Sequence, residues 1–146
     1  MPERRFRYLS HTADISFVAY GGTFKSALEN AALALLNVML DVRKIERARI
    51  GTKRRGIAEK ATSREDLAWF LLQDVLSIVD AEKLNAFGMK VENITETGSG
   101  FSAKAEHLYK PIEKDLALLS VKAVTPSGLT VEKRGSGYSI KVIADV

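Results

Sequence analysis

The 146-residue chain contains no cysteine, only three prolines and only two histidines. Without cysteine the protein has no disulfide bond, no thiol nucleophile and no thiolate ligand for a metal, which is consistent with a reducing compartment. No apolar run reaches the ~18 residues that a membrane-spanning helix needs. The polar start of the chain lacks the apolar segment of a secretory signal. We therefore expect a soluble cytoplasmic protein with no membrane partner.

The common catalytic motifs are also missing. There is no Gly-x-Ser-x-Gly elbow, no Gly-x-x-x-x-Gly-Lys-Ser phosphate loop and no His-Glu-x-x-His zinc motif. Serine and threonine are plentiful, but with two histidines a nucleophile–base pair cannot be assigned. The sequence therefore favours a protein that is not an enzyme. A hydrolase that uses a metal-bound water is the enzymatic alternative.

The pattern of apolar residues predicts a single domain over residues 1–146, with no linker and no repeat. Apolar residues at helical spacing predict two helices, one at 24–40 with Thr23 as its N-cap and one at 63–84 that Ser63 opens. Strand-like segments are expected at 5–9, 15–20, 89–92, 100–105, 120–125, 129–133 and 138–142, with a further strand pair in 43–59. Two helices among many strands predict an α+β two-layer sandwich. We expect a mixed, mostly antiparallel sheet with the two main helices packed on one face.

Carboxylates occur near both ends of the chain. Asp14 follows the first predicted strand, and Asp145 precedes Val146, whose α-carboxylate is a third acidic group. If the sheet brings these ends together, three mutually repelling carboxylates form an all-oxygen site for a hard cation such as Ca²⁺, Mg²⁺ or Mn²⁺. In the alternative, all three are solvent-exposed surface charges. His11 either supports Asp14 at such a site or is a turn residue bonded to the backbone.

Positive charge is concentrated in one segment of a chain whose net charge is +4. Residues 43–55 hold seven lysines and arginines but the single acid Glu46. Such a cluster suits phosphate groups or an acidic protein, although a solvated hairpin edge is the alternative. The candidate contacts for RNA or a protein partner are Arg47, Arg49, Lys53, Arg54 and Arg55.

Five segments of the chain form a recognisable series: His-Thr-Ala-Asp-Ile at 11–15, Ala-Ala at 31–32, Glu-Asp-Leu at 65–67, Val-Lys-Ala-Val-Thr at 121–125 and Val-Ile-Ala-Asp-Val at 142–146. In their order and spacing these segments resemble the archease family. The resemblance spans nearly the whole chain, and it implies a small α+β protein with a metal site made by Asp14, Asp145 and Val146. It implies a protein cofactor of an RtcB-type RNA ligase in tRNA splicing, which promotes guanylylation of the ligase and multiple turnover. A chaperone-like role toward a tRNA modification enzyme, such as a cytosine methyltransferase, is the alternative that it implies.

The chain differs from the family pattern in three places. Pro126-Ser127 stands where the family usually has Tyr-His, His107-Leu108 where it has Gly-Glu, and Asp115 where a histidine is common. The three metal residues are kept. We therefore expect the differences to alter a surface near the last hairpin, where a partner would bind, and to leave metal binding intact.

Overall fold

The computed structural model describes residues 4–9 and 14–146, so His11 lies outside the described residues. In chain order the elements are β1 (Phe6–Leu9), β2 (Ile15–Gly21), α1 (Phe24–Met39), α2 (Val42–Arg47), β3 (Lys53–Ala61), α3 (Arg64–Asp80), β4 (Asn85–Thr97), β5 (Gly100–Lys110), β6 (Ala123–Val124), η1 (Pro126–Gly128), β7 (Thr130–Arg134) and β8 (Gly137–Asp145). Within the described part of the chain, no helix is long and apolar enough to cross a membrane.

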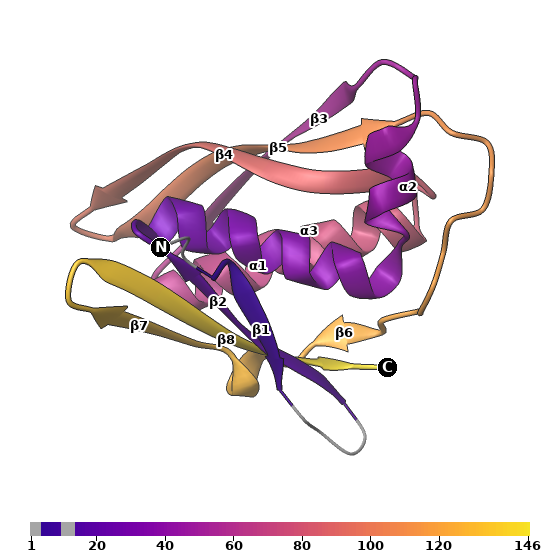
Figure 1. Ribbon diagram of the computed structural model, residues 1–146. Coiled ribbons are helices and arrows are strands. Elements are labelled where there is room, and N and C mark those ends of the chain that lie inside the picture. The colour runs from indigo at the N-terminus through magenta and orange to yellow at the C-terminus, as the bar shows by residue number, and fades with distance from the viewer. Residues whose placement is uncertain (1–3, 10–13) are drawn as a thin grey trace.

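The strands form two antiparallel sheets. One sheet has the order β1-β2-β8-β6, with β7 also paired to β8, and the other has the order β3-β5-β4. Helices α1 and α3 run between the two sheets (Figure 1). The predicted α+β sandwich is confirmed. The single mixed sheet with helices on one face is corrected to two antiparallel sheets that enclose the helices.

The composition of α1 explains why two sheets are needed. Its buried residues lie on more than one side of the helix, and the helix contacts both β2 and β4. A helix that is apolar on several sides must be covered on several sides. Small residues such as Ala27, Ala31 and Ala34, all fully buried, let the covering strands approach closely.

Local hydrogen bonds set the starts of the two long helices, as predicted. Thr23 and Ser26 form a reciprocal capping box before α1, and the Ser63 side chain accepts from the Asp66 N–H before α3. The predicted C-terminal end of the second helix, at residue 84, is wrong. Helix α3 stops at Asp80, and Lys83 has a positive φ of 57°, a left-handed conformation typical of residues that follow a helix end.

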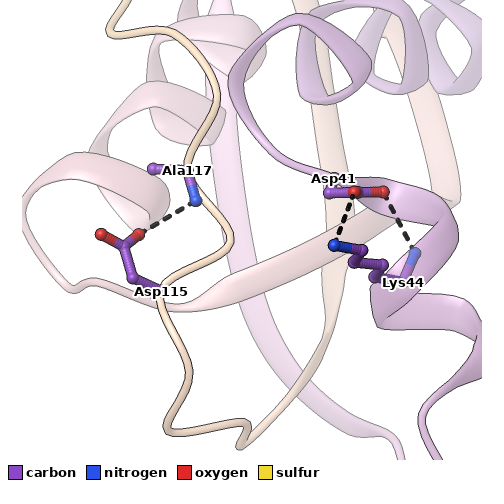
Figure 2. A network of polar contacts seen from close by, with 4 residues as sticks. All are labelled: Asp41, Lys44, Asp115 and Ala117. Carbon is purple, nitrogen blue, oxygen red and sulfur yellow. Dashed lines mark hydrogen bonds and ion pairs between the residues drawn. The ribbon is translucent and has the colours of Figure 1, made fainter.

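The predicted strand pair in 43–59 is also wrong, because its first half is the helix α2. Asp41 caps this helix by accepting from the Lys44 N–H, and the two residues also form an ion pair at 3.8 Å (Figure 2). Val42 and Ile45 are buried on one side of α2, at the i, i+3 spacing of a helix. Only the second half of the segment is extended, as strand β3.

The strand predicted at 120–125 is reduced to the two residues of β6. The preceding connection from β5 runs past the end of α1 instead, where the Leu118 N–H donates to Met39 O and the Asp41 N–H donates to Leu116 O. Figure 2 shows this connection beside the start of α2, with Asp115 accepting from the Ala117 N–H. The two backbone bonds form an isolated antiparallel β-bridge between Leu40 and Ala117.

Candidate metal centre

The pairing of β2 with β8 brings the two acidic chain ends together. The last pair of this ladder is Ile15 opposite Ala144. Asp14 directly precedes Ile15 and Asp145 directly follows Ala144, so the register puts both aspartates at the same end of this ladder. Asp14 is half-buried and Asp145 is exposed, so both are within reach of solvent. The metal site of Asp14, Asp145 and Val146 stays a prediction, and the register places Asp14 at the end of the ladder where the last strand stops.

Strand β6 holds the end of β8 from its other side. The Lys122 N–H donates to Asp145 O at 2.8 Å, and the Thr125 N–H donates to Ile143 O at 2.8 Å. The Thr125 hydroxyl lies 3.5 Å from Asp145 Oδ1, a long contact for a hydrogen bond. Asp145 thus pairs with Ala123 of β6, while Val146 follows β8 and is 40% exposed.

The donor set of this corner suits a hard cation. Two aspartates and a main-chain carboxylate supply only oxygen, which is the donor type that Ca²⁺, Mg²⁺ and Mn²⁺ prefer. Within residues 4–9 and 14–146, no group of three or more His, Cys, Asp and Glu side chains is placed to hold a metal. The candidate site differs from such a cluster because its third acidic group belongs to the main chain of Val146.

A hollow of about 710 Å³ opens next to this corner, between β1, α1 and α2. The polar and charged side chains along it include Arg5, Asp14, Asn37, Arg43 and Glu46. Tyr8 forms part of its wall, where the hydroxyl donates to Ala34 O at 2.7 Å. Burial raises the pKa of Tyr8 to about 12, so this hydroxyl stays protonated. The hollow offers space for a group from a partner beside Asp14.

The five basic candidates lie on a different part of the surface, from the end of α2 through the start of β3. All five are exposed. Arg54 pairs with Glu106 at 3.3 Å, and Arg55 pairs with Glu82. Among the residues that the structure describes, Arg47, Arg49 and Lys53 form no ion pair. These three residues therefore have charges available to a ligand, whereas the charges of Arg54 and Arg55 are partly compensated.

A buried lysine fixes the geometry of this basic segment. Lys110 is 8% exposed, and its ammonium donates to Glu46 O at 2.9 Å and to Ala48 O at 2.8 Å, at the end of α2. It also lies 5.6 Å from the centre of the Phe87 ring. Sequence reasoning gave Lys110 no role, because its partners are 62 and 64 residues away along the chain.

The three departures from the family pattern do not share one surface. Pro126-Ser127 forms the exposed turn η1 between β6 and β7, close to the last hairpin as expected. His107 is only 1% exposed on β5 of the other sheet, and Asp115 lies on the connection that follows β5. The prediction of a common surface near the last hairpin is therefore correct for Pro126-Ser127 and wrong for the other two positions.

The fold and the acidic corner define a small α+β sandwich with a candidate cation site at its chain end. A model of the Archease protein family (MTH1598/TM1083) matches residues 6–146, and the chain belongs to the archease family. The protein archease of Methanosarcina acetivorans is 33% identical over 150 residues, which cover 98% of this chain and 97% of that protein. The protein archease of Thermococcus gammatolerans is 34% identical over 136 residues, which cover 92% of each chain.

Two solved structures share the fold. Protein 1598 of Methanobacterium thermoautotrophicum matches with a TM-score of 0.74 and 28% identity, over 97% of this chain and 99% of that one. A Thermotoga maritima protein, described as an archease and possible chaperone, matches with a TM-score of 0.55 over 100% of this chain and 98% of its own. At 21% identity, this second likeness shows the fold alone.

Proposed function

We propose that the protein is a metal-binding cofactor that activates an RtcB-type RNA ligase in tRNA splicing, in the cytoplasm, by promoting ligase guanylylation and multiple turnover. The observation that carries the proposal is that Asp14 and Asp145 directly adjoin the terminal Ile15–Ala144 pair of the β2–β8 ladder, in a member of the archease family. In this role the protein acts on the ligase and takes no part itself in the RNA-joining reaction, so we assign it no catalytic residue.

In this proposal Asp14, Asp145 and the terminal carboxylate of Val146 hold a divalent hard cation, Ca²⁺, Mg²⁺ or Mn²⁺. The cation supplies positive charge that removes the repulsion among the carboxylates and presents a Lewis acid to the ligase. The exposure of Asp145 and Val146 supports approach by a partner protein. The adjacent hollow, with Arg5 and Arg43 on its walls, has room for an acidic group of that partner.

A ligation time course tests the proposal. The cognate RtcB-type ligase is held substoichiometric to its RNA, and the native protein is compared with Asp14→Asn and Asp145→Asn. We expect the native protein to convert a single round of ligation into many, and each variant to lose most of this gain. Asp80→Asn is the matched control, because Asp80 is an exposed aspartate at the far end of α3. Equal turnover with and without the native protein would exclude the proposal.

A tRNA-binding, chaperone-like modulator of a tRNA modification enzyme, such as a cytosine methyltransferase, is the second candidate. The observation that favours it is the exposed group Arg47, Arg49 and Lys53, which form no ion pair within the described residues. Phosphate contacts made by such residues weaken steeply with salt. Binding to tRNA that does not change between low and moderate salt would argue against this candidate.

A further inference from the structure

Strand β6 forms hydrogen bonds along both of its edges. One edge bonds to strand β8, and the other bonds to side chains of helix α3. Val124 is fully buried, and neither its N–H nor its C=O is directed at β8. The N–H donates to Gln73 Oε1 at 2.8 Å, and the C=O accepts from Trp69 Nε1 at 2.8 Å. A buried backbone group without a partner is destabilising, so these two side chains satisfy the only polar groups of a buried residue.

The other side of the same strand fixes Asp145. The N–H groups of Lys122 and Thr125, which flank β6, donate to Asp145 O and Ile143 O, and Ala123 lies opposite Asp145 in the ladder. Because β6 has only two residues, it has little pairing of its own to hold it in place. The two bonds from α3 therefore help to hold β6 in place, and β6 in turn bonds the backbone of Asp145 at the end of β8.

We propose that Trp69 and Gln73 are positioning residues of the cation site, acting through Val124 and strand β6 on Asp145. The inference rests on the proposed cation site and adds to it two residues that touch neither the cation nor its ligands. Cation ligands must be held within about 0.5 Å of their binding geometry, and outer hydrogen-bond partners that do so are worth roughly 10- to 100-fold in metal affinity.

Trp69 also makes the coupling measurable, because it is the only tryptophan of the chain. Its indole N–H bonds directly to the strand that holds Asp145. Binding of a cation at Asp145 is therefore expected to change the fluorescence of Trp69. Titration of the full-length native protein with calcium chloride should give a saturable change that is absent in Asp145→Asn.

Calorimetric titration with calcium chloride tests the two positioning residues. Gln73→Leu removes the acceptor for the Val124 N–H, and Trp69→Phe removes the donor to its C=O while keeping an aromatic ring. We expect each variant to bind calcium about tenfold more weakly than the native protein. Gln73→Glu keeps an oxygen acceptor and should retain native affinity. Ser77→Ala, at an exposed position of α3, is the matched control.

The outcomes separate this inference from the proposed function. If the native protein binds calcium and both variants bind it equally well, the positioning role is wrong while the cation site stands. If the native protein binds no calcium, the site and the inference fail together. Where a variant does not fold by circular dichroism, the native fluorescence titration decides. Binding seen by calorimetry with no change in Trp69 emission would overturn the coupling.

Discussion

Asp74 on α3 lies beside Glu59 on β3, close enough for the two carboxyl groups to share a proton. Asp74 Oδ2 is buried, and among the described residues no donor reaches it. Two ionised carboxylates have no hydrogen to share, so a proton on one of them makes the contact favourable. Burial, the hydrogen bond that protonated Asp74 donates to Glu59, and repulsion by the charge of Glu59 together raise the pKa of Asp74 to about 8.

This pair predicts a loss of stability as the pH rises. Because the pKa of Asp74 is higher in the folded state than its ordinary 3.8, the folded state holds the proton more tightly. The stabilisation is complete below pH 4 and disappears as the pH rises through 8. Asp74→Asn should therefore be more stable than the native protein at pH 9. The expected gain in the free energy of unfolding is about 1 kcal/mol, because the Asp74 carboxyl group is half-buried and water screens part of its charge. Urea unfolding of both proteins at pH 5 and pH 9 measures this gain. An equal effect of Asp74→Asn at the two pH values would contradict the prediction.

His107 predicts the opposite dependence on pH. Burial lowers its pKa to about 4, with Glu82 acting against this shift and Arg55 adding to it. The unfolded state then binds the proton more readily, so stability is complete above pH 6.5 and falls as the pH drops toward 4. The expected loss is up to about 3 kcal/mol.

Replacement of His107 separates this effect from the other titrating groups. Both ring nitrogens are buried with no partner in the described part of the chain. His107→Leu should therefore raise the unfolding free energy by about 1–2 kcal/mol at pH 7. The same substitution should also remove much of the decline in the free energy of unfolding between pH 6.5 and 4. This decline is measured in proteins that also carry Asp74→Asn, because they lack the opposing titration of Asp74. A decline of native size in His107→Leu would show that other groups cause it.

Lys110→Met is expected to destabilise the protein although the side-chain volume is nearly kept. The substitution removes two charge-assisted hydrogen bonds and leaves the carbonyls of Glu46 and Ala48 without their donor. We expect a loss of about 2–3 kcal/mol in chemical unfolding. Lys60→Met, at an exposed position on β3, is the control and should change stability by less than about 0.5 kcal/mol.

Extension of the chain beyond Val146 tests the third carboxylate of the candidate site. A few added residues convert the α-carboxylate into a neutral amide and leave Asp14 and Asp145 in place. Val146 lies outside β8, so the fold should be unchanged. We expect calcium affinity to fall at least tenfold on calorimetric titration. The same residues added at the N-terminus are the control, and equal affinity of the two extended proteins would remove Val146 from the site.

The ion pairs of the basic segment predict unequal roles for its arginines. Arg54 and Arg55 are paired with Glu106 and Glu82, whereas Arg47 and Arg49 have no ion pair among the described residues. Arg47→Ala with Arg49→Ala should therefore weaken any tRNA binding more than Arg54→Ala with Arg55→Ala. It should also lower the salt slope by about one for each phosphate group that the protein no longer neutralises. Filter binding at several salt concentrations measures both, and equal effects of the two double variants would contradict the inequality.

Features that depend on neighbouring residues could be predicted from the sequence. The caps at Thr23 and Ser63 and the final hairpin through Gly135 follow from side chains and backbone preferences within a few residues. Helix α2 could not be predicted, because a helix of six residues is too short to be stable alone and depends on Lys110 from a distant strand. The division into two sheets was missed for a similar reason, since strand partners are chosen at long range.

The sequence by itself determined which groups the candidate site contains: acids near both ends, all of them oxygen donors, and the family pattern that links them. Only the tertiary structure decided that Asp14 and Asp145 lie at the same end of the β2–β8 ladder. That position follows from the register of β2 and β8, in which Phe17 and Val142 are opposite each other and both buried. A shift of one residue would turn these apolar side chains toward solvent, so burial of the core fixes the register and the register fixes the site.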